Sequence, residues 1–168
     1  MLTVRLTRIS NSRHTMAIIR ADSSSETHEL ETRSTLRHDL VHFAFETEAG
    51  LTESFFGLLA NGATLEALAG KGMESFAPGV EIGMTERIVG PLSGVAYGDT
   101  EIPAFMDGIR RMFAAQGDAA PAWLTPDLVA RVKERYRRLY GQWKATPFGA
   151  TMELTFAPEM TNEKGNAS

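Results

Sequence analysis

The 168-residue sequence contains no cysteine. This absence excludes disulfide bonds, thiolate zinc sites, iron–sulfur clusters and a cysteine nucleophile, and it fits a reducing compartment. A chain of this length can bury roughly 70% of the surface that its unfolded state exposes, so it can build a core without disulfides or a structural metal. The composition therefore predicts an ordinary globular protein, and we expect it in the cytoplasm.

Long apolar runs and an excess of positive charge are also missing. The longest uncharged stretch, residues 54–65, is far shorter than the roughly 20 apolar residues that cross a bilayer. The N-terminus alternates apolar and polar residues and has no apolar run of the kind found in signal peptides. The chain has 17 Lys and Arg against 21 Asp and Glu, a net charge of −4. Because proteins that bind nucleic acid usually have the opposite balance, we predict neither a membrane span nor a nucleic-acid partner.

Two segments alternate apolar and polar side chains as a half-buried β-strand does. The first begins at Leu2 and the second covers residues 151–156. Turn-forming residues after the first strand precede an apolar segment at residues 16–19, which predicts an N-terminal hairpin. A third strand from His28 to Thr32 would lie at the edge of the sheet, because Leu30 is its only apolar residue.

Helical periodicity extends from about Leu36 to about Lys144, interrupted by glycine and proline. The interruptions predict five helices, at about residues 36–49, 52–69, 85–97, 103–115 and 125–144. Thr52 is the expected N-terminal cap of the second helix, and Asn61 with Gly62 is expected to bend or break it. Gly70–Gly83 is predicted to be a long irregular loop, of a length that is often functional.

The predicted strands and helices together indicate an α+β fold. We expect a small antiparallel sheet, made of the N-terminal hairpin and the C-terminal strand, packed against about five helices. The sequence has no internal repeat and no change of composition, so residues 1–157 are predicted to form a single domain. The polar residues 158–168 are predicted to form a flexible tail.

One group of polar residues stands out in the first predicted helix. His38, Asp39, His42 and Glu46 fall within a 100° arc of that helix, and its other sides are mainly apolar. The spacing of His38 and His42 places two imidazoles on adjacent turns, where they can share a divalent metal ion such as zinc. Asp39 resembles the Glu of the H-E-x-x-H motif of zinc proteases, but its shorter carboxylate would need a different position to polarise a metal-bound water.

A metal site on this helix needs a ligand from another part of the chain. Glu46 lies about 12 Å along the helix axis from His38, too far for one ion to bind both. The site would therefore use either His38 with His42, or His42 with Glu46. Asp39 or Glu46 would be the catalytic base or would orient a ligand. The candidates for the remaining ligand are His14, His28, Glu74 and Glu81.

The same residues also have a purely structural interpretation. Asp39 would complement the positive N-terminus of the helix, and His42 with Glu46 would form an ordinary polar pair one turn apart. The basic residues of the last predicted helix likewise flank its apolar stripe, where their stems cover apolar surface and their charges stay in water. These residues are Arg131, Arg135 and Arg138 on one flank and Lys133, Arg137 and Lys144 on the other.

Several segments resemble a family of small uncharacterised bacterial proteins. They are residues 36–46 (LRHDLVHFAFE), 50–51 and 55–60 (FFGLLA), 86–92 (ERIVGPL) and 143–149 (WKATPFG), so the likeness covers most of the chain. Members of that family often have proline where this chain has Arg37, which suits the start of a helix. The resemblance implies a soluble bacterial protein and carries over no activity, cofactor or catalytic residue.

Apart from the arc that contains His38, the sequence has no recognisable nucleophile motif, phosphate loop or dinucleotide fingerprint. We therefore expect a non-catalytic binding or interaction domain for a protein partner or a small ligand. Self-association is expected through an uncovered strand edge or sheet face. The alternative is a divalent-metal-dependent hydrolase that uses His38 and His42 as metal ligands.

Overall fold

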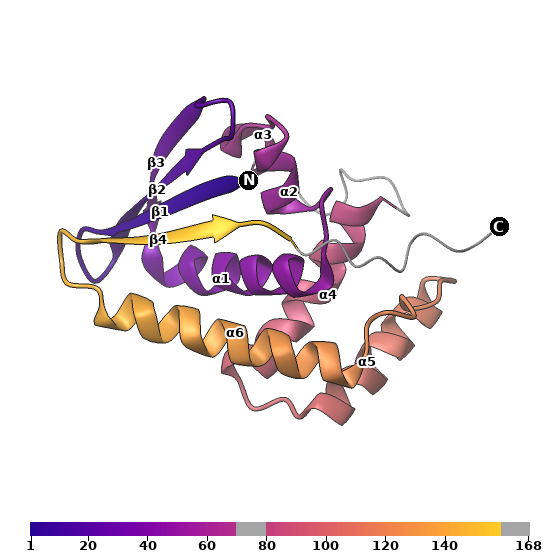
Figure 1. The fold of residues 1–168 in the computed structure, drawn as a ribbon. Coiled ribbons are helices and arrows are strands. Elements are labelled where there is room, and N and C mark those ends of the chain that lie inside the picture. Colours follow the sequence, from indigo (N-terminus) through magenta and orange to yellow (C-terminus); the bar gives the residue numbers. More distant parts are fainter. Residues whose placement is uncertain (70–79, 159–168) are drawn as a thin grey trace.

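The computed structural model describes residues 1–69 and 80–158. One antiparallel sheet has the strand order β3-β2-β1-β4, and helices pack against it (Figure 1). The strands are β1 (Leu2–Arg8), β2 (Arg13–Ile19), β3 (Ser25–Glu31) and β4 (Thr151–Phe156). The helices of the described residues are α1 (Thr32–Ala49), α2 (Phe55–Ala60), α3 (Leu65–Ala69), α4 (Glu81–Tyr97), α5 (Ile102–Ala115) and α6 (Pro126–Ala145). The predicted α+β fold is confirmed.

The two strands with the clearest alternation lie side by side. β1 pairs with β4 in a register that sets Leu2 opposite Phe156 and Thr7 opposite Thr151. The apolar residues of both strands face the helices and are buried, whereas the polar ones alternate outward. β3 is an edge strand as predicted, but it covers Ser25–Glu31, not His28–Thr32. β3 pairs with β2 along its whole length, and this pairing determines where β3 begins and ends. The low apolar content of β3 does not prevent the pairing.

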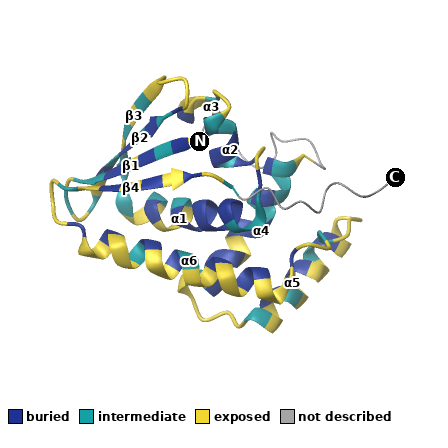
Figure 2. Ribbon diagram, in the orientation of Figure 1, coloured by how far each residue is buried: buried dark blue, intermediate teal, exposed yellow. Residues whose placement is uncertain are grey.

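Helix α1 is the central helix of the molecule. It contacts α2, α4 and α6 as well as the sheet, and Figure 2 shows that its second half is buried. Glu31 caps its N-terminus by accepting the backbone N–H groups of Arg33 and Ser34. The helix ends at Gly50, which adopts the left-handed conformation with φ 65°. The predicted helix from Leu36 therefore begins one turn earlier than expected.

The region after α1 confirms the predicted break at Asn61 and Gly62 and differs from the prediction at Thr52. The helix expected over residues 52–69 is divided into α2 and α3, because Asn61 ends the first and Gly62 adopts a positive φ. Thr52 is not the cap, since α2 starts after Ser54. Most of the predicted loop Gly70–Gly83 lies outside the described residues, but Glu81–Gly83 are helical because α4 begins there. The tail predicted for residues 158–168 also lies outside them, apart from Pro158.

The last helix agrees closely with the sequence pattern. Thr125 caps α6, Pro126 occupies its first position, and the apolar stripe that includes Val132 and Trp143 is buried. This stripe packs against α1, so α1 lies between the sheet on one side and α6 on the other (Figure 1). Among the described helices, none combines the length and the apolar character required to cross a membrane.

Candidate metal centre

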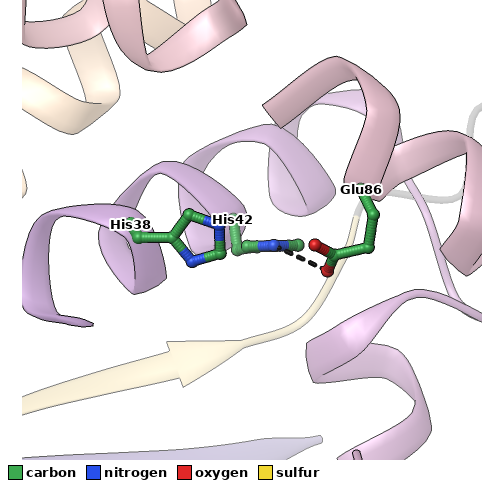
Figure 3. Close-up of side chains that lie close together, drawn as sticks. All are labelled: His38, His42 and Glu86. Carbon is green, nitrogen blue, oxygen red and sulfur yellow. Dashed lines mark ion pairs between the residues drawn. The ribbon is translucent and has the colours of Figure 1, made fainter. Parts of the chain in front are cut away.

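Three side chains with metal-binding groups converge where α1 meets α4. His38 and His42 project from adjacent turns of α1, and Glu86 reaches toward them from α4 (Figure 3). The His42 Nε2 atom lies 3.0 Å from Glu86 Oε1, and the two imidazole centroids are 4.8 Å apart. One ligand atom from each of the three residues lies within 4.8 Å of the others. Two helices therefore bring two imidazoles and one carboxylate to one point.

Burial differs sharply across this group. His42 is 1% exposed, whereas the side chain of His38 is 45% exposed and that of Glu86 is 22% exposed. The cause is the position of His42 at the centre of α1, whose neighbouring residues pack against α2 and α4. His38 lies one turn nearer the N-terminal end of α1. The group thus has a fixed inner side and an accessible outer side.

Glu46 holds His42 from the other side of the imidazole. Its side chain is fully buried, and Oε2 lies 3.1 Å from His42 Nδ1. Its Oε1 atom accepts the backbone N–H groups of Phe56 at 2.8 Å and Gly57 at 3.4 Å. Glu46 therefore connects α1 to the first turn of α2 and fixes the orientation of the His42 ring.

The imidazole of His42 has a carboxylate at each nitrogen. A neutral imidazole has only one N–H, so two hydrogen bonds to carboxylates favour the doubly protonated ring. Burial opposes this charge, but the hydrogen bonds to Glu46 and Glu86 outweigh it and raise the pKa of His42 to about 10. Burial raises the pKa of Glu46 in spite of its hydrogen bonds. Partial burial also tends to raise the pKa of Glu86. The hydrogen bond with His42 outweighs this effect, and the pKa of Glu86 is lowered.

A pocket of about 250 Å³ opens next to these residues. Its polar lining consists of Thr35, His38, Asp39, His42 and Glu86, and its apolar lining consists of Leu30, Phe55, Leu65, Leu68 and Ile82. The Phe55 ring lies 5.6 Å from that of His42, measured between centroids. A ligand in this pocket would contact the imidazoles and the carboxylates while resting on apolar side chains.

The structure brings together the two histidines that the sequence singled out, but Glu86 supplies the third group. The other described candidates make contacts elsewhere. His14 forms a hydrogen bond with Thr32, and His28 pairs with Glu26. Glu81 accepts a hydrogen bond from the hydroxyl of Ser54. Glu74 lies outside the described residues. Asp39 lines the pocket and its carboxylate is 3.8 Å from His38 Nδ1. A catalytic role for Asp39 or Glu46 stays a prediction.

Sequence reasoning missed Glu86, although α4 contains a signal. Glu86 lies one turn after Ile82 and one turn before Val89, both of which are buried. A carboxylate within the apolar stripe of a helix needs a polar partner, and here the partner is His42. Which residue becomes this partner depends on how α4 packs against α1. The periodicity of either helix alone does not reveal that packing.

Gly57 offers a test of the link between Glu46 and α2. A Cβ atom at this position would lie 2.2 Å from the backbone oxygen of Thr52, so the first turn of α2 would have to move. We expect Gly57→Ala to lower the free energy of unfolding by about 1–3 kcal/mol. Chemical denaturation measures this. Gly108→Ala, on an open face of α5, is the control and should not destabilise the protein. Equal effects of the two substitutions would contradict the packing described.

Comparison of the chain with models of protein families, with characterised proteins and with solved structures finds no match. The resemblance to small uncharacterised bacterial proteins stays a prediction.

Proposed function

We propose that the protein binds a divalent transition metal ion, most simply zinc, through His38, His42 and Glu86. The observation that carries the proposal is the convergence of these three ligand atoms within 4.8 Å in the lining of a pocket. Two imidazoles and one carboxylate form the ligand set of many catalytic zinc sites and of non-haem iron sites. The donor types therefore match a metal with catalytic rather than purely structural coordination.

The distances require only a small adjustment. Two ligand atoms of a tetrahedral zinc ion are about 3.4 Å apart, because each lies about 2.0–2.1 Å from the metal. The atoms of His42 and Glu86 are already 3.0 Å apart. No two of the three atoms are more than 4.8 Å apart, so the widest separation would have to shorten by no more than about 1.4 Å. The half-exposed side chain of His38 has the freedom to make this movement by rotating.

Glu46 completes the arrangement as a second layer. By accepting the Nδ1 proton of His42 it keeps that proton in place, so Nε2 is the nitrogen that would bind a metal once its own proton is displaced. Ligating histidines usually have such a carboxylate or carbonyl partner. The backbone N–H groups of Phe56 and Gly57 hold this carboxylate in place. The chain thus provides both the ligands and the group that orients the most buried of them.

The chemistry that we propose is hydrolysis of a small substrate. His38, His42 and Glu86 would hold the ion with three ligands, and the ion would supply an activated water or polarise a substrate oxygen in the pocket. Asp39 lines the same pocket and is the candidate base. The non-catalytic alternative, in which the pocket only binds a small ligand, uses the same apolar lining.

Metal titration of chelator-treated protein without a histidine tag tests the proposal. We expect one zinc ion per chain, bound at least about tenfold more weakly by His38→Ala and by Glu86→Gln. His28→Ala removes an imidazole that pairs with Glu26, away from the three ligands, and should leave zinc affinity unchanged. Circular dichroism confirms that each variant is folded.

Zinc titration and a substrate screen together distinguish the metal-dependent hydrolase from the non-catalytic binding role. Unchanged zinc affinity in both ligand variants, or no binding at all, would refute the metal centre. Stoichiometric zinc with no hydrolysis in a screen of ester, amide and phosphoester substrates would favour the non-catalytic binding role. Hydrolysis that is lost on chelation and restored by zinc would support the hydrolase.

A further inference from the structure

A second pocket of about 420 Å³ lies on the other side of His38, which lines both pockets. Arg8, Arg33, Arg37 and Lys144 contribute four positive charges to its lining, and no Asp or Glu of the described residues lines it. This concentration of positive charge occurs in a chain whose net charge is −4. The charge of this pocket is therefore positive, whereas the net charge of the whole chain is negative.

These four cations form no ion pairs with residues 1–69 or 80–158, which the structure describes. Among the described residues, no carboxylate lies within 4.0 Å of their charged atoms. The neighbouring carboxylate of Glu31 is directed at the backbone N–H groups of Arg33 and Ser34, where it caps α1. The N-terminus of α1 is thus already occupied, and an anion in the pocket would meet side-chain charges instead.

Neutral groups hold two of the arginines in place. The Arg37 guanidinium lies 4.6 Å from the ring centroid of Tyr140 and 5.3 Å from that of Tyr97, and it donates a hydrogen bond of 2.8 Å to the Tyr140 hydroxyl. Arg8 donates to the backbone oxygen of Thr146 at 3.0 Å. Aromatic faces and carbonyls orient a cation without neutralising it. The pocket is therefore arranged to receive a negative charge.

Lys144 joins the arginines through the tertiary fold. Its Nζ atom lies 5.2 Å from the Tyr140 ring, on the side of α6 that packs beside the start of α1. The sequence alone suggested a solvated flank for this residue. The packing of α6 against α1 brings Lys144 close to the arginines of α1 and β1, which precede it by more than a hundred residues in the chain.

We propose that this second pocket binds the phosphate group of a small phosphorylated compound, whose remainder extends past His38 into the first pocket. Phosphate fits because it carries up to two charges, and arginine binds its oxygens in a forked arrangement. A small molecule fits better than nucleic acid because the cations surround a hollow and do not form an extended stripe. The phosphate site itself needs no metal; only the role of the compound as a substrate rests on the proposed function.

Calorimetric titration of the metal-free protein with phenyl phosphate tests the site. We expect one molecule to bind per chain, and Arg37→Gln and Lys144→Gln each to weaken binding about tenfold. Lys133→Gln makes the same change of charge at an exposed position of α6 outside the pocket, and binding should not change. No saturable binding, or an equal loss in all three variants, would overturn the proposal.

Two further titrations identify the kind of ligand. Inorganic phosphate should bind more weakly than phenyl phosphate, because it leaves the first pocket empty; equal affinity would overturn the proposed path past His38. A single-stranded RNA oligonucleotide that displaces phenyl phosphate at lower concentration would overturn the assignment to a small molecule. Because zinc is absent from these measurements, their failure leaves the metal centre intact, and failure of zinc binding leaves the phosphate site intact.

Discussion

Replacement of Glu46 by alanine is expected to lower the free energy of unfolding of the metal-free protein by about 3–5 kcal/mol. The substitution leaves three buried donors without their acceptor: the Nδ1–H of His42 and the backbone N–H groups of Phe56 and Gly57. A buried group that loses its hydrogen-bond partner suffers the full cost of removal from water. The effect is large because the imidazolium of His42 would also lose one of its two counter-charges.

Chemical denaturation of the two substitutions Glu46→Ala and Glu46→Gln measures this effect. Glutamine has nearly the same shape, and its amide oxygen can still accept the N–H of Phe56, so Glu46→Gln should cost less than half as much. Because glutamine keeps the volume, the effect of Glu46→Gln alone reports the loss of the charge and of one carboxylate acceptor without a cavity. An alanine variant as stable as the glutamine variant would show that Glu46 does not connect α1 and α2.

Zinc affinity is expected to rise about hundredfold between about pH 6.5 and 8.5, or tenfold per pH unit. The pKa of His42 is raised to about 10, so throughout this range the metal-free ring carries a proton on Nε2. Zinc must displace that proton to bind, and each rise of one pH unit makes the displacement tenfold easier. A histidine with its ordinary pKa would already be neutral above about pH 7.5, and the affinity would then level off.

Two measurements establish this coupling. Competition with a chelator of known affinity gives the zinc affinity at each pH, and calorimetry in buffers of different ionisation enthalpy counts the protons released. We expect one proton from His42 for each zinc ion bound. The titratable side chains that face the ring are Glu46, Glu86 and His38. An affinity that stays constant above pH 7.5 would contradict the two-carboxylate environment.

The fold could be predicted to a large extent because its strongest signals are local. Alternation at Leu2 and at residues 151–156 predicted β1 and β4, and the apolar stripe with its capping residue Thr125 predicted α6. The errors lie where tertiary contacts override local patterns. β3 has little apolar content but forms by pairing with β2, and the first turn of α4 falls within glycine-rich sequence.

The candidate site could be predicted only in part. The spacing of His38 and His42 is a property of one helix, so the sequence reveals it. Glu86 depends on the packing of α4 against α1, and no periodicity within one helix specifies which residue of another will face it. The four cations of the second pocket come from β1, α1 and α6, and their proximity is likewise a product of the fold.

The pairing of β1 with β4 has a consequence for biosynthesis. Leu2 and Phe156 are partners, although almost the whole described chain separates them. Contacts between residues so distant in sequence form late, because closing a long loop costs entropy before the contact stabilises anything. While the chain is being made, β1 therefore lacks its partner β4, and one of its edges stays unpaired. Until β4 emerges from the ribosome, that edge is open to pairing with strands of other nascent chains.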